Sequence, residues 1–203
     1  MKNFWNERYS EKDYAYGEAP NVFFAEQITS LQVGNLILPA EGEGRNAVFA
    51  ASLGWKVNAF DTSDAAKLKA TLLAGKKGVT IEYTVDDAVS IFYPDNSADV
   101  VAFIFAHFPP SVRKQIHQKA IHWLKPGGKI ILEAFNPNQL NNHSGGPKEI
   151  SMLYTEEMIK NDFEGLEIEI LHSVRTRLNE GKYHEGIADV IQFVGTRKAS
   201  TVY

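Results

Sequence analysis

Between residues 36 and 134, short apolar segments alternate with longer segments whose apolar residues recur at helical spacing. The apolar segments are residues 36–38, 56–60, 80–85, 99–105 and 129–134, and the helical ones are residues 45–53, 64–77 and 111–124. Strands that alternate with helices predict βαβ units, and strands that are apolar throughout predict a parallel sheet covered on both faces. This pattern predicts an α/β fold with an open, doubly wound, mostly parallel sheet between two helical layers.

The segments on either side of this core differ from it. The first 33 residues are rich in aromatic side chains and are interrupted by Gly17 and Pro20. Residues 136–148 form a polar segment that is long for a simple connection, and such loops commonly cover binding sites. A helix is expected at residues 155–162, where Thr155 can cap the first turn.

Two apolar segments near the C-terminus, residues 166–174 and 188–194, predict a β-hairpin with a polar connection at residues 175–186. The hairpin would complete a seven-stranded sheet with an antiparallel C-terminal strand. We therefore expect a single domain over residues 1–203. Its parts are an N-terminal helical lid (1–33), a cofactor-binding core (34–135) and a substrate-side loop, helix and hairpin (136–203).

Composition excludes several classes of protein. The chain has no cysteine, which excludes disulfides and thiolate zinc sites, and we expect no metal site. A net charge of −4 with scattered Lys and Arg is unlike a nucleic-acid-binding surface. No apolar run approaches the ~20 residues of a membrane span, and the N-terminus lacks a signal-peptide core. We expect a cytoplasmic monomer or homodimer without a nucleic-acid or membrane partner.

A glycine-rich segment lies between the first predicted strand and the first predicted helix. Gly42 and Gly44 would let the backbone approach a ligand closely, and the helix N-terminus would offer N–H groups to a negative group. The same glycines, followed by Ala47, also satisfy the GxGxxA pattern of nicotinamide-dependent enzymes. The segment predicts a cofactor loop without deciding between the cofactors, and it can also be a turn that serves only the fold.

Asp61 ends the second predicted strand, where a carboxylate can accept hydrogen bonds from both ribose hydroxyls of an adenosine. It can equally cap the helix that begins after Ser63. Asp87 and Ala88 follow the third strand. Residues 124–128, with sequence LKPGG, lead into the fifth strand as a turn that ends a helix.

With these residues in place, residues 34–134 resemble the class I S-adenosylmethionine-dependent methyltransferases, which have a Rossmann-like fold. A narrower resemblance is to the small bacterial enzymes of the tellurite-resistance (TehB-like) type. It rests on FWNERY at residues 4–9, Tyr16-Gly17 with Pro20-Asn21, EGRNA at residues 43–47, Glu133 with Phe135, GGPK at residues 145–148, and the spaced set Leu178, Glu180, Gly181, Tyr183, His184 and Gly186.

The resemblance implies S-adenosylmethionine as the cofactor and S-adenosylhomocysteine as its product. It assigns the methionine end to Gly42, Gly44 and Asn46, the ribose to Asp61 and Thr62, the adenine to Asp87 and Ala88, and the pocket wall to Phe105 and Ala106. Trp5 could close over the sulfonium with its π face, and Arg8 could pair with the cofactor carboxylate. The aromatic residues of this segment could instead simply pack on the sheet, and Arg8 could lie in solvent.

The chain departs from the family pattern at two positions. The family has an acidic residue at the end of the first strand and one more glycine, where this chain has Leu38 and Ala40. Glu41 is our candidate for the missing carboxylate, directed toward the cofactor's ammonium group.

Three side chains are candidates for a catalytic role. His107 follows the fourth strand at the edge where open sheets bind ligands, and it can be either a base or a packed side chain. Glu180 and His184 form a second pair in the late polar segment, which could also be a solvated hairpin tip. His117 and His122 lie on a predicted helix, and we expect both at the surface.

The sequence therefore predicts methyl transfer to a small molecule, with a thiol, an oxyanion or a metalloid as possible acceptors. Nucleic-acid amino methyltransferases carry an Asn/Asp-Pro-Pro-aromatic motif after strand four, whereas this chain has HFPP at residues 107–110. Two alternatives stay open. One is a non-catalytic protein that binds the cofactor or a partner on this fold, and the other is a nicotinamide-dependent oxidoreductase.

Overall fold

A computed structural model describes residues 2–199 of the chain. Its strands are β1 (Asn35–Pro39), β2 (Lys56–Asp61), β3 (Glu82–Val85), β4 (Ala98–Ile104), β5 (Leu124–Phe135), β6 (Leu166–Asn179) and β7 (Glu185–Arg197). Its α-helices are α1 (Lys2–Tyr9), α2 (Val22–Thr29), α3 (Arg45–Ser52), α4 (Asp64–Lys77), α5 (Pro110–Trp123) and α6 (Glu156–Asp162). Two short 3₁₀ helices, η1 (Pro137–Asn141) and η2 (Ile150–Met152), lie between β5 and α6.

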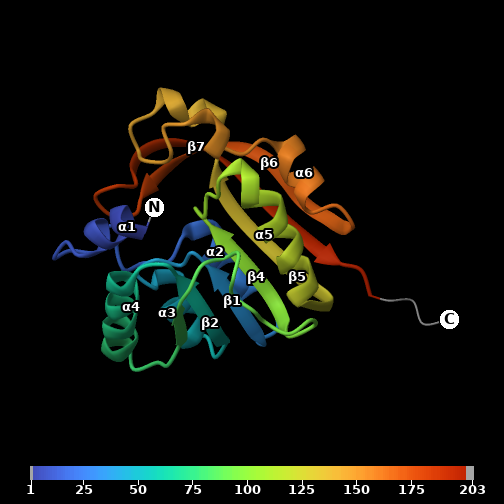
Figure 1. Ribbon diagram of the computed structural model, residues 1–203, viewed down its shortest axis with the longest axis horizontal. Coiled ribbons are helices and arrows are strands. Elements are labelled where there is room, and N and C mark those ends of the chain that lie inside the picture. Colours follow the sequence, from blue (N-terminus) through green and yellow to red (C-terminus); the bar gives the residue numbers. More distant parts are fainter. Residues whose placement is uncertain (1, 200–203) are drawn as a thin grey trace.

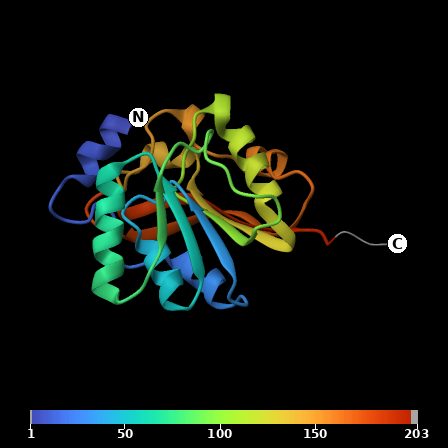
Figure 2. The ribbon, with the colours of Figure 1, turned by 60° about the horizontal axis from the view of Figure 1, so that its bottom comes forward.

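The seven strands form one sheet in the order β3-β2-β1-β4-β5-β7-β6 (Figures 1 and 2). The strands β1 to β5 pair in parallel, and β7 pairs antiparallel to both β5 and β6. Only β7 therefore runs against the rest of the sheet. The predicted Rossmann-like sheet with an antiparallel C-terminal strand is confirmed.

Helices cover both faces of the sheet because alternate strand residues point to opposite sides. On one face, Ile37 and Phe103 belong to a buried cluster with Ile116 and Trp123 of α5 and with residues of α6. On the other, Leu36 and Leu38 belong to a cluster with residues of α2, α3 and α4. Figure 1 shows α5 and α6 on the near side of the sheet. The result is the three-layer arrangement that the apolar strands predicted.

The C-terminal hairpin is much longer than the sequence indicated. Strands β6 and β7 pair from Leu166↔Arg197 to Asn179↔Glu185, with one irregularity between Ile168 and Ile170, which leaves only residues 180–184 as the turn. The polar connection expected at residues 175–186 is therefore wrong. Arg175 and Arg177 are exposed while Leu178 is buried, as on an edge strand with one solvated face. Polarity on that face was mistaken for a loop.

The N-terminal segment contains two helices, α1 and α2. α1 lies beside α4 in both views (Figures 1 and 2). Beyond α1, the chain is held to the hairpin turn by a hydrogen bond from Tyr183 N–H to Ala15 C=O, at 3.3 Å. Among residues 2–199, no helix combines the length and the apolar character needed to cross a bilayer.

Candidate functional site

The strand order reverses between β1 and β4, since the chain leaves β1 toward β2 and leaves β4 toward β5. Ligands of open α/β sheets bind beyond the carboxyl ends of the strands at such a point. Two non-glycine residues there have left-handed backbones, Ala40 after β1 (φ 51°) and Phe105 after β4 (φ 52°). A non-glycine residue in this region costs about 1–2 kcal/mol, and such strain clusters at functional sites.

The two glycines of the loop after β1 are required for different reasons. Gly44 is the N-cap of α3 (φ 86°), and a Cβ there would lie 2.6 Å from the Ala70 side chain of α4. Its role is therefore to let two helices approach. Gly42 (φ 63°) faces the N-terminal segment, and a Cβ on it would lie 2.6 Å from the hydroxyl oxygen of Tyr9. Of the two glycines, only Gly42 lies between the N-terminal segment and the carboxyl end of the sheet.

Glu41 occupies the N-terminus of α3 with its own carboxylate. Its Oε1 accepts the N–H groups of Asn46 (2.9 Å) and Ala47 (2.8 Å), and its Oε2 has only a 3.4 Å contact with Asn46 Nδ2. The expectation that a ligand's negative group would take these N–H groups therefore needs correction, because Glu41 already uses them. Burial raises the pKa of Glu41 to about 7 despite these hydrogen bonds.

Asp61 at the end of β2 is buried and fixes the same loop. Its oxygens accept hydrogen bonds from Gly42 N–H (3.1 Å) and Ser63 N–H (3.0 Å), and Thr62 also donates to it. Burial raises the pKa of Asp61 above its usual value. Ser63 itself caps α4 through Ala66 N–H, so the predicted link to the helix start is present.

Asp87 and Ala88 lie just after β3, at the same end of the sheet. Asp87 is exposed, and its Oδ1 accepts the N–H of Val89 at 2.8 Å, which fixes the turn. Ala88 is buried against the cluster that contains Phe60 of β2. Parallel strands β1, β2 and β3 thus end in Glu41, Asp61 and Asp87, three acidic side chains along one edge.

The predicted lid residues pack against one another above this edge. Trp5 stacks on Tyr9, with ring centroids 5.5 Å apart and planes at 19°. The guanidinium of Arg8 lies 4.0 Å from the Tyr183 ring centroid and donates to the Tyr16 hydroxyl at 3.1 Å. Arg8 is therefore engaged with the hairpin turn and with its own segment.

His107 has both ring nitrogens engaged by the backbone. Its Nδ1 lies 2.7 Å from Met152 C=O, and its Nε2 accepts the N–H of Phe135 at 3.2 Å. This pattern fixes a neutral tautomer, and burial lowers the pKa of His107 to about 4. With neither nitrogen available, His107 positions the chain after β4, and this geometry disfavours the catalytic role considered for it.

His117 is not at the surface as expected. Its ring is fully buried, with Nδ1 2.9 Å from Asp162 Oδ2, and Arg113 Nε lies 2.6 Å from the same oxygen. The position on α5 faces α6 rather than solvent, which helical spacing alone did not reveal. His122 is exposed, as predicted.

Glu180 and His184 are buried at the hairpin turn rather than solvated. Glu180 Oε2 lies 2.9 Å from Arg45 Nη2 and 3.3 Å from His184 Nδ1. Burial opposes ionisation of Glu180, but the hydrogen bond from His184 and the charge of Arg45 outweigh it and lower its pKa to about 2. Burial lowers the pKa of His184. The pair is therefore a carboxylate beside a neutral imidazole, with Arg45 as the counter-charge.

Three further polar residues, Asn21, Glu133 and Gln192, complete this cluster, and sequence reasoning gave them no role. Asn21 donates from Nδ2 to Glu180 Oε1 (3.0 Å) and to Glu133 Oε1 (2.7 Å). Gln192 Nε2 donates to the other oxygen of Glu133 at 2.7 Å. Glu133 stands in an otherwise apolar strand, and an isolated charge of this kind was the available signal.

Aromatic rings enclose the imidazole of His184. The ring centroid of Tyr16 lies 4.3 Å away, that of Phe105 4.5 Å and that of Phe135 5.2 Å. Gly145 (φ 101°) closes the remaining side, where a Cβ would lie 2.8 Å from His184 Cδ2. The polar segment after β5 is thus one wall of the site. Ala106, by contrast, is buried in the cluster on the α5 face, where its C=O accepts a hydrogen bond from the Tyr154 hydroxyl at 3.1 Å.

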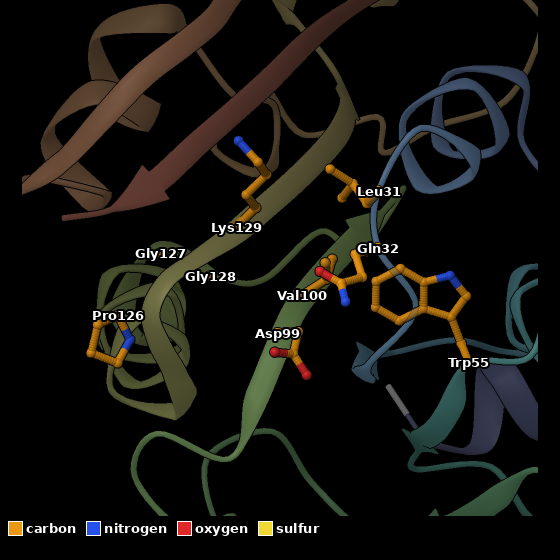
Figure 3. A pocket seen from close by; sticks show the side chains of 9 residues that line it. All are labelled: Leu31, Gln32, Trp55, Asp99, Val100, Pro126, Gly127, Gly128 and Lys129. Carbon is orange, nitrogen blue, oxygen red and sulfur yellow. The ribbon is translucent and has the colours of Figure 1, made fainter. Parts of the chain in front are cut away.

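A separate cavity of about 260 Å³ lies at the other end of the sheet. Figure 3 shows its lining, with the indole of Trp55 beside Gln32 and with Lys129 directed away from Asp99. Asp99 is paired with Lys125 at 2.7 Å. The cavity lies at the amino ends of β4 and of the main run of β5, the end where open sheets do not bind their ligands.

Sequence comparison finds one match, in the middle of the chain. Residues 40–128 match the family model of a methyltransferase domain. Residues 40–128 are therefore similar to a methyltransferase domain, and this match covers less than half of the chain. No curated protein sequence matches it.

Solved structures of low sequence identity share the fold. One comes from work on the conversion of a disulfide bond into a thioacetal group during echinomycin biosynthesis (17% identity, TM-score 0.79, covering 99% of this chain and 94% of that one). Another is TehB from Haemophilus influenzae (13%, 0.73, covering 97% and 67%). A third is a geranyl diphosphate methyltransferase in complex with GPP and sinefungin (11%, 0.69, covering 97% of each). At these identities the likeness concerns the fold alone.

Proposed function

We propose that this chain is an S-adenosylmethionine-dependent methyltransferase acting on a small molecule. The observation that carries the proposal is the row of acidic side chains after three adjacent parallel strands, Glu41, Asp61 and Asp87, at the switch point of a methyltransferase domain. Carboxylates placed in this way suit the ammonium, the ribose hydroxyls and the adenine amino group of one extended ligand.

The described residues fit the adenosine end of that ligand well. Asp61 is held by Gly42 and Ser63 N–H groups, and Tyr9 packs directly on Gly42, where a Cβ would lie 2.6 Å from its hydroxyl oxygen. At the methionine end the fit is through Glu41, since its Oε1 is used by α3 while Oε2 has only a long contact. Leu38 is a core residue with 1% exposure, so Glu41 takes over the carboxylate that the family has at that strand end.

The N-terminal segment serves as the lid of this site. Tyr9 lies on Gly42, and Tyr16 lies on His184, so the segment spans both the cofactor loop and the hairpin turn. Its movement admits ligands, and its return excludes water. When bound, S-adenosylmethionine supplies an electrophilic methyl group on a sulfonium, and the protein aligns the acceptor with it.

Ligand-dependent stability tests the proposal. The melting temperature would be measured with S-adenosylmethionine, S-adenosylhomocysteine and NAD, and binding would be quantified by calorimetry. A ligand at about 100 times its dissociation constant adds about 2.7 kcal/mol to the unfolding free energy. We expect this increase with both sulfur compounds but not with NAD, and we expect Asp61→Asn to weaken binding while exposed Asp95→Asn does not.

Stabilisation by NAD alone would refute the proposal in favour of the oxidoreductase. Absence of binding by both sulfur compounds would refute it outright. Tight binding without methyl transfer to any acceptor would favour a non-catalytic binding protein on this fold.

A further inference from the structure

His184 has one ring nitrogen held by the protein and one that no described residue hydrogen-bonds. Nδ1 faces Glu180 at 3.3 Å. A Cβ on Gly145 would lie 3.4 Å from Nε2, so that nitrogen faces the glycine turn of the wall rather than a side chain. The ring also packs against Phe105, the strained residue at the end of β4. An imidazole oriented by a carboxylate and open at Nε2 has the arrangement of a general base.

The charges around the pair fix its protonation. Arg45 already neutralises Glu180 at 2.9 Å, and Asn21 donates to the second oxygen of that carboxylate. Protonation of His184 would therefore place a second positive charge beside that of Arg45, and both oxygens of Glu180 are already engaged. The imidazole is neutral, with its proton on Nδ1 and a lone pair on Nε2.

We propose that His184 removes the proton from a neutral hydroxyl acceptor as that oxygen is methylated, with Glu180 as the positioning residue; this rests on the proposed methyl transfer. The acceptor oxygen bonds to the methyl carbon while the bond from that carbon to the sulfonium sulfur breaks. The sulfur keeps the electron pair, and the hydroxyl proton passes to Nε2. The imidazolium formed keeps its Nδ1 hydrogen bond to Glu180 until it returns the proton.

The surroundings of the pair select the class of acceptor. The buried acidic side chains at this edge are Glu41, Glu43, Asp61, Glu133 and Glu180, against the cations Arg8, Arg45 and Lys69. An anionic acceptor would meet an excess of carboxylates, which disfavours oxyanions. The rings of Tyr16, Phe105 and Phe135 offer flat apolar walls. A phenol combines an apolar ring with a hydroxyl that stays protonated near neutral pH.

The tautomer of His184 gives a test that does not require turnover. Histidine ¹⁵N NMR of the whole protein, with His184→Gln for assignment, would report which nitrogen carries the proton. We expect the Nδ1–H form in the wild type and loss of that preference in Glu180→Gln. A wild-type proton on Nε2 would overturn the proposal, because that nitrogen could not then accept one.

Methylation of two probes completes the test. Phenol and 4-nitrophenol would be compared with labelled S-adenosylmethionine at a pH where only the nitrophenol is ionised. We expect His184→Gln to lower kcat for phenol by about 100-fold or more, the usual contribution of a general base, and to lower the slower reaction of 4-nitrophenolate much less, because that acceptor has no proton to remove. The retained nitrophenolate reaction also shows that the variant is folded, and exposed His122→Gln is the matched control.

The outcomes separate the two proposals. Equal losses for both phenols would overturn the role of His184 as a base. S-adenosylmethionine binding without methylation of either phenol by the wild type would overturn the acceptor class while the proposed cofactor stands. Absence of S-adenosylmethionine binding would overturn both.

Discussion

The molecule contains the same trio of side chains twice, an arginine, a carboxylate and a histidine. The inner trio, Arg113–Asp162–His117, lies between α5 and α6 on one face of the sheet. The outer trio, Arg45–Glu180–His184, lies at the carboxyl edge of the strands. In both, the histidine meets the carboxylate through Nδ1.

The two trios differ in what surrounds the second ring nitrogen. Nε2 of His117 is buried without a partner, and the ring is packed by Phe103 at 5.0 Å and Phe163 at 4.7 Å. Nε2 of His184 faces the glycine turn at Gly145. The inner trio joins two neighbouring helices, whereas the outer one joins α3 to the hairpin turn and is bonded to Asn21. In our proposal, position relative to the strand ends, rather than residue type, decides which trio holds the fold and which serves chemistry.

The largest effect should come from breaking the inner trio. Asp162→Ala would leave Arg113 and His117 without their shared carboxylate, and removing one partner of a buried pair costs about 3–5 kcal/mol. We expect the unfolding free energy from urea titration to fall by that amount, while the affinity for S-adenosylmethionine in the folded protein is unchanged. Selective loss of cofactor affinity with normal stability would show that the two trios do not differ as argued.

A second effect concerns the carboxylate beside the outer trio. Burial raises the pKa of Glu41 in the folded protein to about 7, above the 4.5 of a free glutamate. The protonated form of Glu41 therefore contributes fully to the unfolding free energy below the unfolded-state pKa of 4.5. This contribution, about 3 kcal/mol, is lost as the pH rises from there through 7. Urea titrations between these values should show this loss in the wild type and not in Glu41→Gln.

The same titration predicts the opposite trend for the cofactor. An ammonium group pairs with ionised Glu41, so S-adenosylmethionine affinity measured by calorimetry should rise as pH passes through 7. Glu41→Gln should bind more weakly at high pH and lose this dependence. Exposed Glu26→Gln is the control, and an unaltered pH profile in Glu41→Gln would place the ammonium elsewhere.

The sequence was sufficient where a local pattern determined the structure. Apolar strands such as residues 99–105 predicted the parallel sheet, and Asp61 at a strand end predicted one side of the site. It was insufficient where contacts join distant segments. The burial of His117 depends on Asp162 of another helix, and the length of β6 depends on pairing with β7, so neither follows from its own neighbours. The use of the α3 N–H groups by Glu41 was likewise hidden, because spacing does not show which carboxylate turns back onto its own helix.

The smallest effect should come from relieving backbone strain near the outer trio. Among the described residues, no left-handed non-glycine residue belongs to the inner trio. Ala40 has a left-handed backbone (φ 51°) at the end of β1. A glycine there avoids the Cβ penalty but loses more chain entropy on folding, so Ala40→Gly should raise the unfolding free energy by up to about 1 kcal/mol. Ala50→Gly within α3 should lower it by about 1 kcal/mol, because that alanine is helical. If both substitutions destabilised the protein equally, the backbone at residue 40 would carry no strain. Opposite signs would show that the chain tolerates strain at the edge where we place its chemistry.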